Sequence, residues 1–299
     1  MICAALPVSV MAQHCDEDSR KALAWLDKTS RAWDELSYRG VVSIQRGDDI
    51  QVIEVAHRAG GQTSNELISA LTDRGGSAQN IEHSVKGMHP GQQLLRYGAQ
   101  TEGGAGGCGV ARYYSLSLSE GQPVAGQDTV HLYLKPRDVY RYGYLMALDK
   151  HTGLLLKAQI ISPQGKTLER FQFARIEYSA PLAGIEVEVP TAAQVAADEV
   201  VGMPVVPVWA PKWLPEGFVL TDTRNPLQRL TYTDGLSVFS VFRELVDEPI
   251  VAGEGVVRLG GTVSYTRGVM HANQAVLVTV VGDVPVNTAR MVADAVLRP

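Results

Sequence analysis

The sequence is poor in positive charge and in cysteine. Its 299 residues carry 27 Lys and Arg against 32 Asp and Glu, a formal net charge of −5, and no run of Lys and Arg stands out. This balance argues against a nucleic-acid-binding protein, which would present a basic surface. The length favours two domains, and the 45% of hydrophobic residues can form a sizeable core.

The cysteines are too few for a disulfide scaffold. Only Cys3, Cys15 and Cys108 are present, so the hydrophobic core must supply most of the stability. Export would allow Cys15 and Cys108 to be oxidised, but their spacing does not show whether they lie within bridging distance.

Metal-ligand and catalytic motifs are also missing. The seven histidines form no metal-ligand spacing, and the sequence has neither a Gly-x-Ser-x-Gly elbow nor a dinucleotide-binding glycine motif. Cys108 could act as a nucleophile with His83 or His131, yet a cysteine in a glycine-rich loop is more often inert or half of a disulfide. We therefore expect a binding protein rather than an enzyme, without cofactor or metal.

No apolar run reaches the length of a membrane span; the best, residues 200–209, is broken by Pro204 and Pro207. Residues 1–12 resemble the remnant of a secretory signal, because Val10-Met11-Ala12 has the small-residue spacing of a cleavage site. A buried N-terminal strand is the alternative. We expect an exported, soluble protein.

Hydrophobic periodicity divides the chain into two folded parts. A helix is predicted over residues 16–36, and alternating segments separated by glycine turns predict an antiparallel sheet up to residue 178. The pattern dissolves into Ala, Val and Pro, then strands resume and a helix closes the chain near residues 287–297. The predicted units are a large domain over 13–185, a linker over 186–210 and a small domain over 211–299.

The predicted fold class is α+β. A curved antiparallel sheet with one helix against its concave side would make a half-open barrel, and the small domain would add a second sheet and helix. Inward-facing side chains could line a cavity for an apolar ligand; the candidates are Trp25, Trp33, Val42, Ile44, Val52, Leu132 and Leu134. Whether they line a cavity or simply pack against one another stays open.

Several motifs resemble one family. In the first part these are YRG at 38–40, EVAHR at 54–58, PRD at 136–138, YRYGY at 140–144, LDKHTGLLLK at 148–157 and GKTLERFQF at 165–173. In the second they are WLPEGF at 213–218, LTYTDGLSVFSVF at 230–242 and VTVVGDVP at 278–285. Together they resemble the RseB/MucB family of periplasmic sigma-factor regulators, with the weakest match between about 60 and 127.

The resemblance implies a lipoprotein-carrier-like large domain and a regulatory function. Such a protein would bind the periplasmic part of a transmembrane anti-sigma factor, shield it from regulated proteolysis, and release it on sensing lipopolysaccharide or a related lipid. The envelope-stress sigma factor would then stay sequestered until release. A periplasmic lipid or lipoprotein carrier is the main alternative, and a hydrolase with a triad assembled from distant residues is a third.

Two groups of residues are candidates for partner binding, because aromatic side chains and arginine are enriched at binding hot spots. They are Tyr140, Arg141, Tyr142 and Tyr144 in the large domain, and Phe239, Phe242 and Arg243 in the small one. For each, a purely structural role is the alternative. We expect Arg141→Ala combined with Arg243→Ala to weaken binding without changing thermal stability. The sequence leaves open which sigma factor and lipid are involved, and whether the protein is a homo-oligomer.

Overall fold

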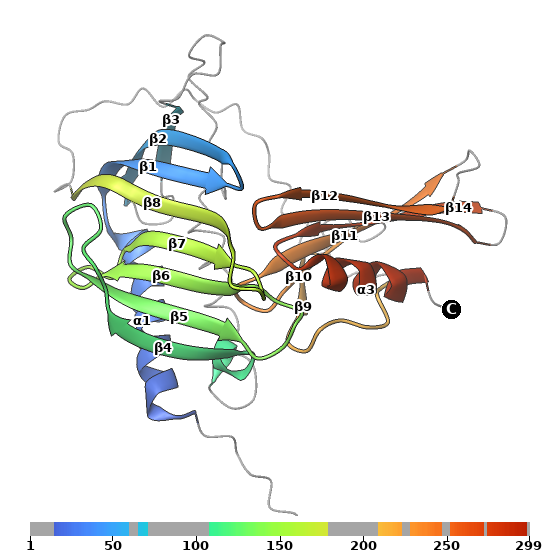
Figure 1. Cartoon of the computed structure of the whole chain (residues 1–299), viewed down its shortest axis with the longest axis horizontal. Coiled ribbons are helices and arrows are strands. Elements are labelled where there is room, and N and C mark those ends of the chain that lie inside the picture. The colour runs from blue at the N-terminus through green and yellow to red at the C-terminus, as the bar shows by residue number, and fades with distance from the viewer. Residues whose placement is uncertain are drawn as a thin grey trace, which may run out of the picture.

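The computed structural model describes residues 15–59, 65–70, 108–178, 209–222, 228–246, 252–271 and 274–297. These form two antiparallel sheets, each with one helix against a face (Figure 1). The predicted signal remnant, most of the glycine-rich stretch at 103–109 and all but the last two residues of the predicted linker lie outside the described residues.

Helix α1 spans Glu17–Glu35, within one residue at each end of the predicted helix. Asp16 caps its N-terminus, where one carboxylate oxygen accepts a hydrogen bond from the Ser19 backbone N–H at 2.7 Å. This bond and a second one from the Ser19 hydroxyl lower the pKa of Asp16. One helix face, including Ala22 and Trp33, is buried against the sheet.

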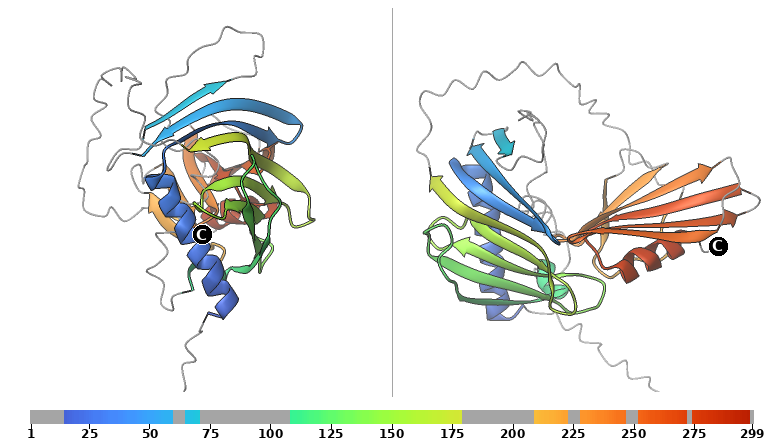
Figure 2. Two further views of the ribbon diagram at one scale, coloured as in Figure 1. Left: turned by 90° about the vertical axis from the view of Figure 1, so that its left-hand side faces the viewer. Right: turned by 45° about the horizontal axis from the view of Figure 1, so that its top comes forward.

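The larger sheet has eight strands in the order β3-β2-β1-β8-β7-β6-β5-β4. Its strands are β1 (Tyr38–Arg46), β2 (Asp49–Arg58), β3 (Asn65–Ala70), β4 (Tyr114–Glu120), β5 (Thr129–Pro136), β6 (Gly143–Asp149), β7 (Leu155–Ile161) and β8 (Thr167–Tyr178). Within the described residues, the end strands β3 and β4 do not pair with each other, so the sheet is open. It curls around α1 (Figure 2), which confirms the predicted half-open barrel with a helix on its concave face.

A glycine allows the sheet to close tightly at β1. A Cβ atom at Gly40 would lie 2.3 Å from the carbonyl oxygen of Arg175 on β8. Any side chain there would push β1 away from β8, and these two strands join the N-terminal part of the sheet to the rest.

The smaller sheet has six strands in the order β12-β13-β14-β11-β10-β9. They are β9 (Val219–Asp222), β10 (Arg229–Thr233), β11 (Val238–Val246), β12 (Gly253–Leu259), β13 (Thr262–His271) and β14 (Gln274–Gly282). Helix α3 (Val286–Leu297) packs on one face, with Ala289, Val292 and Ala293 fully buried. This confirms the predicted second sheet with a closing helix.

A disulfide joins Cys15 to Cys108, with Cα atoms 5.6 Å apart across a separation of 93 residues. Cys108 directly precedes a short 3₁₀ helix, η2 (Gly109–Arg112), which leads into β4. The pairing that the sequence left open is therefore present. Among the described helices, none is long and apolar enough to cross a membrane.

Candidate functional site

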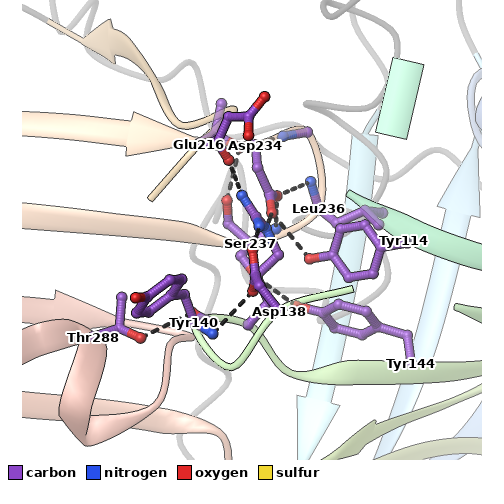
Figure 3. A network of polar contacts seen from close by, with 12 residues as sticks. Tyr114, Asp138, Tyr140, Tyr144, Glu216, Asp234, Leu236, Ser237 and Thr288 are labelled. Carbon is purple, nitrogen blue, oxygen red and sulfur yellow. Dashed lines mark hydrogen bonds and ion pairs between the residues drawn. The ribbon is translucent and has the colours of Figure 1, made fainter. Parts of the chain in front are cut away.

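The two sheets meet at a polar joint. The connection between β5 and β6 (residues 137–142) faces the β10–β11 turn (residues 234–237) and the segment before β9 (residues 216–218), as Figure 3 shows. We call this group of contacts the joint. Leu236 of the small domain belongs to the hydrophobic core of the large one, so the joint also contributes apolar packing.

Arg141 is the centre of the joint. Its side chain is 0% exposed, as is that of Asp234, and its Nε donates to the Asp234 carboxylate at 2.7 Å. The guanidinium also donates to Asp138 and to the backbone carbonyl of Glu216. It lies over the rings of Tyr113 and Phe218, at 4.9 and 5.1 Å from their centroids. One side chain therefore contacts both domains through charge, hydrogen bonds and stacking.

Burial alone would lower the pKa of Arg141, but the carboxylate of Asp234 reverses the effect and the net pKa is raised. The Arg141 guanidinium is consequently held in its charged form. A buried charge is tolerated only when its partner and its hydrogen bonds are complete, and separating the domains would remove both.

Each oxygen of the Asp234 carboxylate accepts two hydrogen bonds. One oxygen accepts from the backbone N–H groups of Leu236 and Ser237 at 2.9 and 2.8 Å. The other accepts from Arg141 and from the Tyr114 hydroxyl, the latter at 3.0 Å. The β10–β11 turn thus orients the carboxylate from its own domain, and the large domain supplies a cation and a hydroxyl.

Two tyrosines of the large sheet complete the network. Tyr114 contacts Asp234, and the Tyr144 hydroxyl lies 2.9 Å from the Ser237 hydroxyl. Burial, and next the negative charge of Asp234, raise the pKa of both phenols well above the usual value of 10.0. Both therefore stay protonated at neutral pH and serve as hydrogen-bonding groups.

Tyr140 joins the large domain to the small one beside α3. Its ring centroid lies 5.2 Å from that of Trp213, and its backbone carbonyl accepts from the Thr288 hydroxyl at 3.0 Å. Nearby, Gly217 has a φ of +89°, and a Cβ there would lie 2.3 Å from the Tyr113 ring. The glycine in the WLPEGF motif is therefore required for close approach of the two domains.

A second contact lies at the β12–β13 turn. Gly260 approaches Arg46 and Glu169 of the large sheet, which form an ion pair at 3.1 Å. The Asp283 carboxylate accepts a hydrogen bond from the Thr262 hydroxyl at 2.7 Å, and it interacts electrostatically with both members of this ion pair. Burial raises the pKa of the Asp283 carboxyl, the bond from Thr262 lowers it and Glu169 adds a further rise, for a net upward shift.

The predicted partner-binding residues differ in burial and in the face of the sheet on which they lie. Arg141, Tyr142, Tyr144 and Phe239 are buried, Tyr140 and Arg243 are half-buried, and Phe242 is 37% exposed. The register places Phe239 and Arg243 on the α3 side of the sheet and Phe242 on the opposite side. Their direct contact with a partner stays a prediction. Arg141, Tyr142 and Tyr144 would need the joint to open, whereas Phe239 lies in the core of the small domain.

One expectation needs correction. Arg141→Ala combined with Arg243→Ala was expected to leave thermal stability unchanged, but the Arg141 change would leave Asp234 as a buried carboxylate without its cation. Loss of stability is the expected outcome, because removing one partner of a buried ion pair is strongly destabilising.

Most of the predicted cavity-lining residues are packed together. Trp33, Val42, Ile44, Leu132 and Leu134 belong to one buried cluster, and Trp25 packs against it. Val52 was placed wrongly: it pairs with Ser43, so its side chain lies on the face opposite Val42 and Ile44. A strand alternates its faces, and the assignment to the concave side was off by one residue.

Sequence reasoning missed Asp234, Ser237 and Tyr114. The Asp-Gly pair at 234–235 lies inside the LTYTDGLSVFSVF motif but has no predicted contact, and Tyr114 is not among the predicted site residues. Nothing in the local sequence shows that a turn aspartate will meet an arginine 93 residues earlier. Within the described residues, no group of three or more His, Cys, Asp or Glu is arranged to hold a metal ion.

Comparison with known proteins places the chain in a family. The MucB/RseB N-terminal domain family matches residues 21–193, and the MucB/RseB C-terminal domain family matches residues 205–297. The chain belongs to the MucB/RseB family.

Curated members of this family share sequence over different lengths. The sigma factor AlgU regulatory protein MucB of Pseudomonas aeruginosa is 30% identical over 301 residues, which cover 92% of this chain and 90% of MucB. The sigma-E factor regulatory protein RseB of Haemophilus influenzae is 27% identical over 184 residues, 58% of this chain and 56% of RseB.

Solved structures of MucB have the same fold. A crystal structure of MucB in complex with MucA(peri) has a TM-score of 0.66 and 30% identity, and covers 91% of this chain and 97% of that one. A crystal structure of MucB has a TM-score of 0.59 and 29% identity, with 92% and 97% covered.

Proposed function

We propose that this protein is a negative regulator of an envelope-stress sigma factor. It binds the periplasmic domain of a MucA- or RseA-like transmembrane anti-sigma factor and shields that domain from regulated proteolysis. The observation that carries the proposal is the similarity to MucB, over both domains, in a structure where MucB is bound to MucA(peri).

The two-domain architecture is suited to binding a partner that a second ligand can release. If the partner prefers one arrangement of the domains and a lipid such as lipopolysaccharide prefers another, each ligand weakens the binding of the other by the same factor. The joint around Arg141 and Asp234 is a discrete contact that such ligands could favour or break. Regulation then requires no catalytic chemistry, which is consistent with a regulatory rather than an enzymatic family.

The periplasm is the proposed location. One family member, MucB, has been solved in complex with MucA(peri), and an exported protein can keep the Cys15–Cys108 disulfide. No cofactor enters the proposed function.

Co-purification from periplasmic extract tests the proposal. The tagged protein should recover an anti-sigma factor fragment, and the purified fragment should resist its membrane-associated protease when mixed with the regulator. A Gly217→Leu variant, which pushes Tyr113 out of the joint, should protect less well. Cleavage of the fragment at the same rate with and without the wild-type protein would refute the proposed function.

A further inference from the structure

The Cys15–Cys108 disulfide connects the start of helix α1 with the start of the short helix η2. Cys15 immediately precedes the cap residue of α1, the helix that packs into the curved sheet. Cys108 immediately precedes η2, the short helix that leads to the joint. Cys108 is buried and Cys15 is only half-buried, so Cys15 is the more accessible of the two residues.

The segment after Cys108 reaches the small domain within a few residues. Arg112 lies 3.7 Å from the Glu216 carboxylate, the Tyr113 ring fills the space above Gly217, and Tyr114 donates to Asp234. A shift of η2 would therefore move three contacts between the domains at once.

The same segment also positions the other half of the joint. Arg137, at the start of the β5–β6 connection, donates its Nε to the Ala111 carbonyl at 3.3 Å and its backbone N–H to the Tyr113 carbonyl at 2.9 Å. Arg141 follows four residues later and stacks on the Tyr113 ring. The η2 segment thus supports Arg141 as well as contacting the small domain directly.

We propose that the Cys15–Cys108 disulfide is a redox-controlled tether: its reduction loosens the joint and weakens binding of the anti-sigma factor. The part that concerns binding rests on the proposed function. The disulfide fixes the residue before η2 to the residue before the cap of α1, with the two Cα atoms 5.6 Å apart, so its reduction frees the start of η2 from the start of α1.

The reductant is a dithiol, such as the active site of an exported oxidoreductase. Its thiolate attacks the accessible Cys15 sulfur, the bond between the two sulfurs breaks, and Cys108 leaves as a thiolate that takes up a proton. The second thiol of the reductant then attacks the mixed disulfide and releases Cys15. The protein gains two thiols while the reductant becomes a disulfide.

The first experiment measures the joint without any partner. Hydrogen–deuterium exchange is followed in the Cys3→Ser background, oxidised and after dithiothreitol, at residues 109–116 and 234–237. We expect faster exchange in both segments after reduction. The matched control is Cys15→Ser with Cys108→Ser, which should exchange quickly in both conditions and show no response to dithiothreitol. Equal exchange in the oxidised and reduced proteins would overturn the tether.

The second experiment measures binding to the purified periplasmic domain of the MucA-like anti-sigma factor from the same organism. Reduction, or the double serine variant, should weaken binding at least about fivefold, the lower range of ordinary allosteric coupling. Affinities within twofold of each other would overturn the proposal, even with faster exchange. If the oxidised wild type does not bind the domain, the proposed function fails, and the exchange experiment still decides whether the tether exists.

Discussion

At the scale of single residues, Arg141 decides how the two domains are held together. We expect Arg141→Met to lower the free energy of unfolding by about 3–5 kcal/mol, because it retains much of the apolar stem but leaves Asp234 buried without its cation. Urea denaturation measures the loss. The matched control is Arg39→Met, which breaks the exposed pair with Glu177 and should cost no more than about 1 kcal/mol.

Equal losses in these two variants would show that the Arg141–Asp234 pair contributes no more than a surface contact. Combining Arg141→Met with Asp234→Asn should cost less than the two single changes added together, because the second change removes the unpaired charge.

The same residues show where sequence reasoning stops. The aromatic and arginine residues at 140–144 were identified as important from their composition, and they do lie at a site of many contacts. Their partners could not be predicted, because Asp234, Ser237 and Thr288 are 93 to 148 residues away in sequence. A binding motif and an interdomain motif have the same composition, since both combine aromatic rings with a buried cation.

At the scale of elements, the two faces of strand β11 contribute differently to the free energy of unfolding. Phe239 is fully buried in the hydrophobic core of the small domain, whereas Phe242 lies on the opposite face of the sheet and is partly exposed. We expect Phe239→Ala to lower the free energy of unfolding by about 3–5 kcal/mol and Phe242→Ala by about 1 kcal/mol or less. Denaturant titration of both variants checks this difference, and similar losses would contradict the register of β11.

Helices and most strands could be predicted because their sequence patterns are local. Helix α1 has Asp16 as a cap and apolar residues at helical spacing, and most strands lie between glycine turns. Strand β12 has no such local pattern. Its seven residues are all exposed and include Gly253 and Gly255, so neither alternation nor β propensity marks it, and it forms only through pairing with β13.

At the scale of the whole molecule, the two domains could be predicted as separate units but not their joint. Each domain has its own hydrophobic core, and a core leaves a periodic pattern in the sequence. The joint consists of turns, with polar contacts and aromatic packing between residues remote in sequence, for which no periodic pattern exists. The disulfide is similar, because two cysteines do not reveal their distance.

If the joint transmits the lipid signal, partner and lipid must be linked through it. We expect lipopolysaccharide to raise the dissociation constant of the anti-sigma domain about 5–150-fold, and the anti-sigma domain to weaken lipopolysaccharide binding by the same factor. Titrations in both orders measure the two factors. Arg141→Met should bring both toward one, because it removes the contact that distinguishes the two arrangements, whereas Arg39→Met should leave them unchanged. A full coupling factor that survives Arg141→Met would show that the signal travels by a route other than the joint.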